Sequence, residues 1–321
     1  MSNRIRAFGP RLPLMAAPMS IASTVALVSA CSRAGITACF PTHNAARDGG
    51  LASWLSRIQA DQKAFADQGG CPAPFAVNIN VSRHKPQHVL DQEIADCRAA
   101  GISIITSNAG NPAELVKRVH DWGGIVIHDA TTVEQAEKAA AAGVDGLMLV
   151  CAGAGGLGGL LSPFAFVPKV RSFFGGIIQL AGGVADGTGI AAAEILGADM
   201  VCMGTRFIAT EESGVAAGHK QMLARARMSD IVWTENIVGI GANFLRPSII
   251  ACGLDPDDLP QLTADGRTTM SRSIKPWADV WSAGHSAALI KHVPTVASLI
   301  VQLEDEYREA SQPRKTAVPC P

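Results

Sequence analysis

The sequence predicts an α/β fold of the (β/α)8 barrel type, with a smaller α-rich domain inserted near its end. Eight short apolar runs recur along the first two thirds of the chain, and a helical pattern follows each of them. The runs begin 21 to 39 residues apart, close to the length of a strand–helix unit. Alternating buried strands and helices indicate a parallel sheet, and eight units favour closure into a barrel. A doubly wound open sheet is the alternative.

The eight predicted strands are bounded by glycines and helix caps. They are Leu14–Ala17, Ile36–Phe40, Phe75–Asn80, Ile102–Thr106, Ile125–His128, Gly146–Val150, Ile177–Leu180 and Met200–Met203. Asn111-Pro-Ala-Glu114 and Thr131-Thr-Val-Glu134 have the order of residues expected where helices begin. Helical stretches end at Gly35, Gly101, Gly143 and Gly197, just before the next strand.

The strand–helix rhythm breaks after the eighth run. Residues 207–275 contain a helical pattern at Val215–Arg227 and a polar, turn-rich stretch around Asp255–Asp265. We therefore predict a barrel made of residues 1–206 and 276–310, with residues 207–275 inserted as a smaller domain. Trp277–Val301 is predicted to be helical and to close the barrel. Residues 311–321 contain three prolines and are predicted to be a disordered tail.

Charge and cysteine usage exclude several classes of partner. Lys and Arg total 27 and Asp and Glu total 28, which gives no reason to expect a nucleic acid or an anionic membrane surface. No run of about 18 apolar residues indicates a membrane helix. No apolar signal segment precedes Pro13, and the cysteines have no paired spacing, so reduced thiols and a cytoplasmic location are expected. The apolar content of 48% leaves room for a homodimer interface.

Three glycine-rich loops point to a phosphate-bearing ligand. Cys151–Gly159 follows one predicted strand directly, and the runs Ile177–Gly183 and Met200–Arg206 end in the same way. Glycine lets a backbone approach a ligand closely, although tight turns alone would also explain Gly-Gly pairs. In barrels of this type the loops after strands seven and eight usually hold phosphate. Those loops contain Gly182, Gly183, Gly204 and Thr205.

The other predicted strand ends carry further candidate site residues. In a barrel the active site lies at the C-terminal ends of the strands. These ends include Ala17, Pro18, Met19, Ser20, His43, Asn78, Asn80, His128, Asp129 and Ala181. The two asparagines could instead form turns, and the two histidines could be structural. No pattern of metal ligands and no nucleophile–base pair is visible.

Several motifs in this order resemble the nitronate monooxygenase family, formerly called 2-nitropropane dioxygenases. They are Met15-Ala-Ala-Pro-Met19, Ser107-Asn-Ala-Gly-Asn-Pro112, Gly143-Val-Asp-Gly146, Ala181-Gly-Gly183, Gly204-Thr-Arg-Phe207 and Trp281-Ser-Ala-Gly284. Related flavin-dependent enoyl reductases and NADH:quinone reductases share this type of barrel.

The resemblance implies non-covalently bound FMN and assigns the site residues to it. Pro18, Met19 and Ser20 match the loop that borders the flavin ring, and Asn78 and Asn80 match polar groups near it. His128, or Asp129 beside it, matches a cofactor contact at the end of strand five. The backbones of Gly156, Gly183, Gly204 and Thr205 match contacts to ribityl and phosphate.

One residue departs from the family pattern. The glycine loop of the family usually reads Gly-Gly-His, with the histidine as catalytic base, and Leu157 stands at the matching position. Leucine accepts no proton, so His43 and His128 become the candidate catalytic residues. Deprotonation of neutral nitroalkanes should be impaired, while an already anionic nitronate needs no base. Leu157 also suits a small-molecule substrate with an apolar part.

The expected function is FMN-dependent oxidation of alkyl nitronates with O2. An NAD(P)H-dependent reductase of a quinone or enoyl substrate is one alternative. A catalytically silent flavin-binding protein and a phosphate-binding barrel without flavin are the others.

Overall fold

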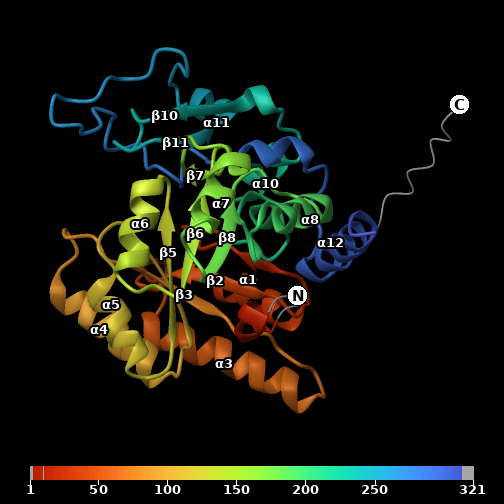
Figure 1. The fold of residues 1–321 in the computed structure, drawn as a ribbon. Helices are drawn as coiled ribbons and strands as arrows, with labels where there is room; N and C mark the ends of the chain where they lie inside the picture. The colour runs from red at the N-terminus through yellow and green to blue at the C-terminus, as the bar shows by residue number, and fades with distance from the viewer. Residues whose placement is uncertain (1–2, 10, 313–321) are drawn as a thin grey trace, which may run out of the picture.

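The computed structural model describes residues 3–9 and 11–312, and its centre is a closed barrel of eight parallel strands (Figure 1). The strands are β1 Leu14–Ala16, β2 Thr37–Pro41, β3 Ala76–Asn80, β4 Ile104–Asn108, β5 Ile125–Ala130, β6 Gly146–Val150, β8 Ile177–Ala181 and β9 Met200–Met203. Each strand pairs with its neighbour in sequence, and β9 pairs with β1, so that Met15 lies beside both Thr37 and Cys202. The predicted barrel is confirmed, and all eight strands lie within two residues of their predicted bounds.

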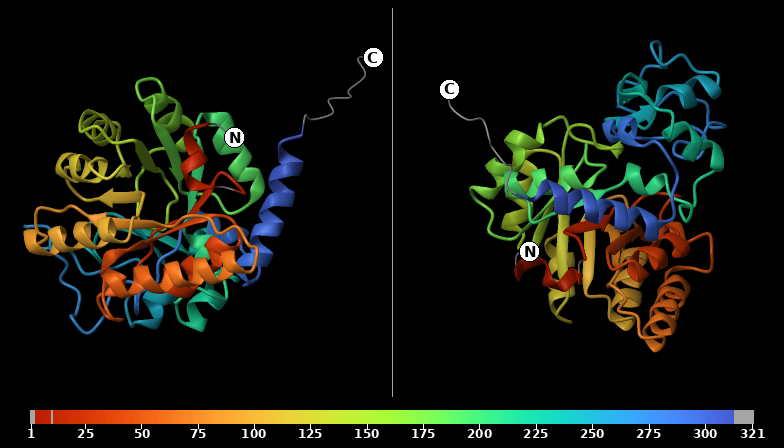
Figure 2. Two further views of the ribbon diagram at one scale, coloured as in Figure 1. Left: turned by 90° about the horizontal axis from the view of Figure 1, so that it is seen from below. Right: turned by 90° about the vertical axis from the view of Figure 1, so that its right-hand side faces the viewer.

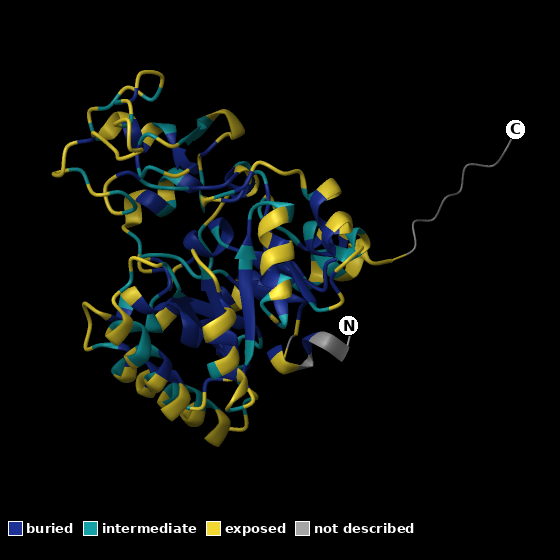
Figure 3. Ribbon diagram, turned by 60° about the vertical axis from the view of Figure 1, so that its left-hand side comes forward, coloured by how far each residue is buried: buried dark blue, intermediate teal, exposed yellow. Residues whose placement is uncertain are grey.

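Helices surround the barrel, with their exposed faces turned outward (Figure 3). They are α1 Val25–Arg33, α2 Thr42–Ala45, α3 Leu51–Asp67, α4 Gln87–Ala99, α5 Ala113–His120, α6 Val133–Ala141, α7 Pro163–Arg171, α8 Gly187–Leu196 and α12 Val296–Ala310. The predicted glycine stops are confirmed, because Gly35, Gly101, Gly143 and Gly197 all have positive φ. The start of α6 lies one residue later than predicted, since Thr132 accepts the capping hydrogen bond from the Gln135 N–H.

Two apolar layers hold the barrel together. One layer lies between strands and helices and includes Phe40, Trp54 and Phe166. The other fills the barrel interior with Met15, Ile127, Met200 and neighbouring side chains. The short 3-10 helix η1 (Asn3–Phe8) contributes Ile5 and Phe8 to this inner layer, at the end of the barrel away from the small sheet (Figure 2).

A three-stranded antiparallel sheet stands over the C-terminal end of the barrel strands (Figures 1 and 2). It has the order β10 (Ile231–Thr234), β11 (Ala242–Leu245), β7 (Gly156–Leu157). The chain around it forms only short helices: α9 Thr205–Ile208, α10 Ala217–Leu223, η2 Met228–Asp230 and α11 Arg246–Ala251. The predicted α-rich domain is therefore corrected to a small sheet with short helices. The boundaries at residues 207 and 275 stay a prediction.

A glycine allows close packing within this small sheet. An added Cβ at Gly241 would lie 2.3 Å from the Trp233 ring, so the indole of β10 packs directly on a glycine beside β11.

The prediction of one helix over residues 277–301 was wrong. It holds the short 3-10 helix η3 (His285–Leu289), and α12 begins only after Pro294, with Thr295 as its cap.

The C-terminal helix completes the ring around the barrel. Helix α12 packs against α8 and α1, the place of an eighth barrel helix. The predicted disordered tail falls almost wholly on residues 313–321, which lie outside the described residues. Within the described ranges, no helix is long and apolar enough to cross a membrane.

Candidate active site

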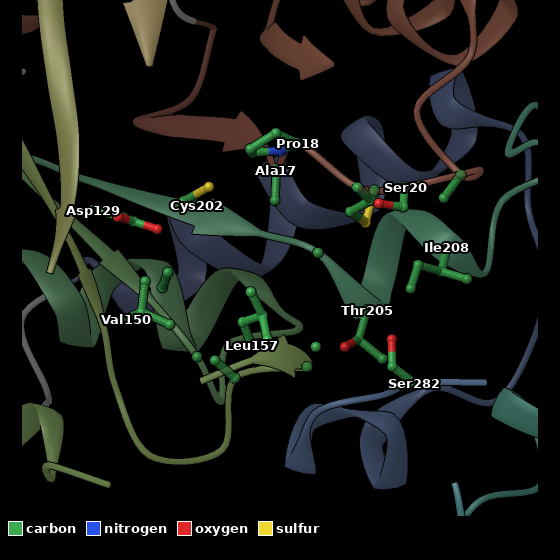
Figure 4. Close-up of a pocket in the computed structure, with 18 of the residues that line it drawn as sticks. Ala17, Pro18, Ser20, Asp129, Val150, Leu157, Cys202, Thr205, Ile208 and Ser282 are labelled. Atoms are coloured by element: carbon green, nitrogen blue, oxygen red, sulfur yellow. The ribbon is translucent and has the colours of Figure 1, made fainter. Parts of the chain in front are cut away.

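A cavity of about 500 Å³ opens at the C-terminal ends of the barrel strands, beneath the small sheet. Its walls include all but one of the residues that the sequence placed in the site. The predicted residues that line it are Ala17, Pro18, Met19, Ser20, His43, Asn78, Asn80, Gly156, Ala181, Gly182, Gly183, Gly204 and Thr205. Leu157, Asp129 and Cys202 line it as well (Figure 4). The exception is His128.

The loops after β8 and β9 present free backbone donors. The N–H groups of Gly183, Gly204 and Thr205 have no acceptor within the described part of the chain, while the Gly182 N–H faces β9 through the pairing of Ala181 with Cys202. Gly182 has a φ of 120°, and an added Cβ would lie 3.0 Å from the Ala154 N, so this loop needs glycine. Unpaired N–H groups that converge on a cavity form an anion site.

Thr205 also joins this site to the segment before η3. The Gly284 N–H donates to the Thr205 Oγ1 at 2.9 Å. An added Cβ at Gly284 would lie 2.3 Å from the Gly153 carbonyl oxygen, so the glycine loop after β6 lies directly against this segment. Residues of the three glycine loops therefore line the cavity together with Ser282, which lies beside Thr205 (Figure 4).

A serine–histidine pair lies on the β1–β2 side. The Ser20 Oγ and the His43 Nε2 are 2.8 Å apart. Asn44 holds the loop that carries Ser20, because its Nδ2 donates to the Met19 carbonyl at 3.0 Å. Burial lowers the pKa of His43, and the positive charge of Lys85 lowers it further, so the imidazole is neutral at pH 7 and able to accept a proton.

Strand parity decides which residue of the His128–Asp129 pair reaches the cavity. Asp129 has the same parity as Ile125 and Ile127, which pack in the barrel interior. His128 has the opposite parity, and its Nδ1 lies 2.8 Å from the Ser107 Oγ. Burial lowers the pKa of His128 to about 4. The structure thus brings His43 to the cavity and does not bring His128 there, which leaves the predicted catalytic and cofactor roles of His128 without support.

Polar side chains from β3 and β4 line the wall opposite β8 and β9. The Asn78 Nδ2 donates to the Thr106 Oγ1 at 3.0 Å, and the Asn80 Oδ1 accepts from the Ser82 N–H at 2.8 Å. The Asn108 Oδ1 is buried at the cavity without a hydrogen-bond partner among the described residues. This wall is able to accept and donate hydrogen bonds to a polar ring edge.

Apolar side chains form the remaining wall. Leu157, on β7, pairs with Ala242 of β11 and faces the cavity together with Ile208 and Trp277. His219, within the predicted helical stretch Val215–Arg227, also lines the cavity. Its ring stacks on Trp281 at 5.1 Å, and burial lowers its pKa to about 4.

Four of these lining residues were not identified from the sequence, or were identified only as part of a pair or motif. Asp129 could have been chosen over His128, because Asp129 continues the alternating positions of the apolar residues Ile125 and Ile127. Asn108 lies within the motif Ser107-Asn-Ala-Gly-Asn-Pro112, which was singled out only as a whole. His219 and Trp277 come from the segment after β9, where no local pattern indicates a position over the barrel.

A family model described as nitronate monooxygenase matches residues 56–306. The chain belongs to the nitronate monooxygenase family. It is therefore an oxidoreductase of this family, whose members are typically FMN flavoproteins.

Individual relatives agree with the family. The chain is 26% identical to a nitronate monooxygenase of Paraburkholderia phytofirmans, over 93% of each protein. It is 27% identical to a 5-hydroxy-7a-methyl-1-oxo-octahydro-1H-indene-4-carboxyl-CoA dehydrogenase of Mycobacterium tuberculosis, over 74% of this chain and 64% of the relative. The solved structure of FabK from Thermotoga maritima superposes with a TM-score of 0.75 at 25% identity, over 96% of both chains.

The cavity fits FMN on the chemistry of its walls. Three unpaired N–H groups after β8 and β9 suit a phosphate, and the opposite wall offers the unpartnered Asn108 Oδ1 and the Asn78 amide to a polar ring edge. The volume of about 500 Å³ lies within the range of cofactor sites.

Proposed function

We propose that this protein binds FMN in the cavity and oxidises alkyl nitronates with O2. The observation that carries the proposal is the cradle of unpaired N–H groups from Gly183, Gly204 and Thr205, in a barrel of the nitronate monooxygenase family. These groups would hold the phosphate, and Asn78, Asn80 and the Ala17–Ser20 loop would border the flavin ring. Bound FMN supplies the electron acceptor for the nitronate and the reductant for O2.

Leu157 stands, in this proposal, where the family has its catalytic histidine. The side chain lines the cavity from β7 and offers no atom that accepts a proton. An anionic nitronate lacks the acidic Cα proton and would be oxidised without a base. The wall formed by Leu157, Ile208 and Trp277 would hold the apolar part of the substrate.

His43 would act as the base for any neutral nitroalkane. Its imidazole is neutral at pH 7, and the Ser20 hydroxyl fixes the orientation of the ring at 2.8 Å. His43 follows β2 and Leu157 follows β6, and these strands lie on opposite sides of the eight-stranded barrel. A neutral nitroalkane that His43 deprotonates would therefore bind with its C–H bond toward His43, on the side of the cavity opposite Leu157.

A reductase is the second candidate, and the absence of a base at Leu157 together with the apolar wall favours it. Such an enzyme would take electrons from NADH or NADPH and pass them to a quinone or an enoyl substrate. The relationship to FabK and to a CoA dehydrogenase is consistent with this reaction class.

Anaerobic mixing of the yellow protein with single electron donors tests the two candidates. Loss of flavin absorbance with an alkyl nitronate alone would support the proposed oxidation. Loss only with NADH or NADPH would favour the reductase. No change with any donor would contradict both and indicate a silent flavin-binding protein.

A further inference from the structure

Asp129 is a buried carboxyl group that the proposed oxidation does not use. Among the described residues that line the cavity it is the one carboxylate, and it projects into the cavity from β5 on the side away from Thr205 and Ser282 (Figure 4). The titratable groups around the same cavity are Cys202 on β9, His43 on α2 and His219 on α10. Within residues 3–9 and 11–312, no ion pair joins Asp129 to a cation.

The loop after β4 is shaped around this carboxyl. The Ala109 N–H donates a hydrogen bond to Asp129, and Ala109 takes the left-handed conformation, with a φ of 62°. A residue with a Cβ adopts this conformation only where its surroundings impose it. Gly110 is wedged beside it, because an added Cβ would lie 2.3 Å from the Val81 carbonyl oxygen. The fold thus fixes the carboxyl in the cavity with a single neutral donor.

The strand order defines what would face Asp129. Strands β3 and β4 lie across the barrel from β8 and β9, and β5 is next to them. A flavin whose phosphate lies at Gly183 and Gly204 would extend its ring toward this side. The polar edge of the ring carries one N–H donor and several acceptors. The unpartnered Asn108 Oδ1 is suited to accept from the N–H of the ring. Asp129 would then face the hydrogen-bond acceptors of the ring.

We propose that Asp129 is protonated when flavin occupies the cavity and donates a hydrogen bond to the ring, so that flavin binding takes up a proton. The inference rests on the proposed cofactor but not on the proposed substrate. Burial already raises the pKa of Asp129 to about 7 without a ligand. A flavin ring would exclude the remaining water and raise the pKa further, because no cation offsets the lost hydration.

The proposal predicts how flavin affinity changes with pH. If flavin binds the protonated form, affinity is greatest below the pKa of the free protein, about 7. Above it, affinity falls by up to about tenfold per pH unit until the pKa of the complex is reached. Riboflavin is the better probe, since the phosphate of FMN titrates in the same range.

The experiment measures riboflavin binding to the apoprotein by quenching of flavin fluorescence, from about pH 6 to about pH 8.5. We expect the wild-type affinity to fall across this range and the Asp129→Asn affinity to stay level, since an amide also donates but does not titrate. Asp121→Asn, on an exposed turn, is the matched control and should keep the wild-type slope. His43→Gln should also keep it, which separates the two cavity groups.

Direct proton uptake provides a second readout that needs no variant. Mixing wild-type apoprotein with riboflavin in weak buffer near pH 8 should raise the pH by the equivalent of almost one proton per flavin bound. A flat or rising affinity with pH, no proton uptake, or an unchanged slope in Asp129→Asn would overturn the proposal. Absence of flavin binding at every pH would remove the proposed cofactor as well. Linked binding without nitronate oxidation would remove only the proposed substrate.

Discussion

Gly284 supports the cavity wall, and Gly284→Ala should open that wall. The backbone of Gly284 has a φ of −91° and a ψ of 175°, which alanine adopts freely. The added Cβ, however, would lie 2.3 Å from the Gly153 oxygen and 2.7 Å from the Gly155 N. Both atoms belong to backbone, so no side-chain rotation relieves the contact. The first distance is 0.7 Å inside the 3.0 Å that real Cβ contacts respect.

The cost of this contact is that of overpacking a close-packed site. Such insertions destabilise proteins by about 1–3 kcal/mol, which lowers Tm by roughly 2–4 °C per kcal/mol in a protein of about this size. The loop at 153–155 or the Thr205 contact must move, so flavin affinity should fall at the same time. The assay is thermal unfolding together with the FMN retained after gel filtration. Gly175→Ala is the control, because nothing lies within 4 Å of its added Cβ. A Gly284→Ala protein with the Tm and flavin content of the wild type would refute the packing of this wall.

Three further predictions concern protons. Leu157→His should raise turnover of neutral nitroalkanes by up to about 100-fold, with little effect on nitronates, because it restores a base. Equal gains on both substrates in steady-state assays would show that the new histidine does not act as a base. With neutral nitroalkanes, kcat/KM should fall only below pH 6.5, since burial lowers the pKa of His43. His43→Gln should abolish this acid limb, while a nitronate substrate shows no such loss. Burial lowers the pKa of His128 and His219 to about 4, whereas in the unfolded chain a histidine is protonated below about pH 6.5, so each should lower the free energy of unfolding by about 2 kcal/mol at about pH 5 relative to pH 7. Urea unfolding of His219→Gln at the two pH values should therefore show a smaller loss of stability than the wild type. An identical loss would contradict this expectation.

The barrel was predictable because each of its signals is local. A strand such as Gly146–Val150 is a continuous apolar run, and stops such as Gly197 mark the end of a helix in the sequence itself. The small sheet had no such signal. Strand β7 is only Gly156–Leu157 within a glycine loop, and it is a strand because β11, some 85 residues later, pairs with it.

The candidate site was predictable to the same extent. Strand ends and glycine loops indicated most of the lining residues, because the barrel fixes where those ends meet. The choice between His128 and Asp129 required the parity of β5, which depends on where the barrel interior lies. His219 and Trp277 reach the cavity only through the tertiary position of the chain after β9.

The phosphate cradle is the centre of this account, and comparison of FMN with riboflavin tests it most directly. Equilibrium binding of both flavins to the apoprotein at one pH isolates the phosphate, since the rings are identical. The unpaired N–H groups of Gly183, Gly204 and Thr205 predict one FMN per chain, bound at least about 100-fold more tightly than riboflavin, from about 3 kcal/mol for charged hydrogen bonds. Equal affinities, or no binding of either flavin, would contradict the account.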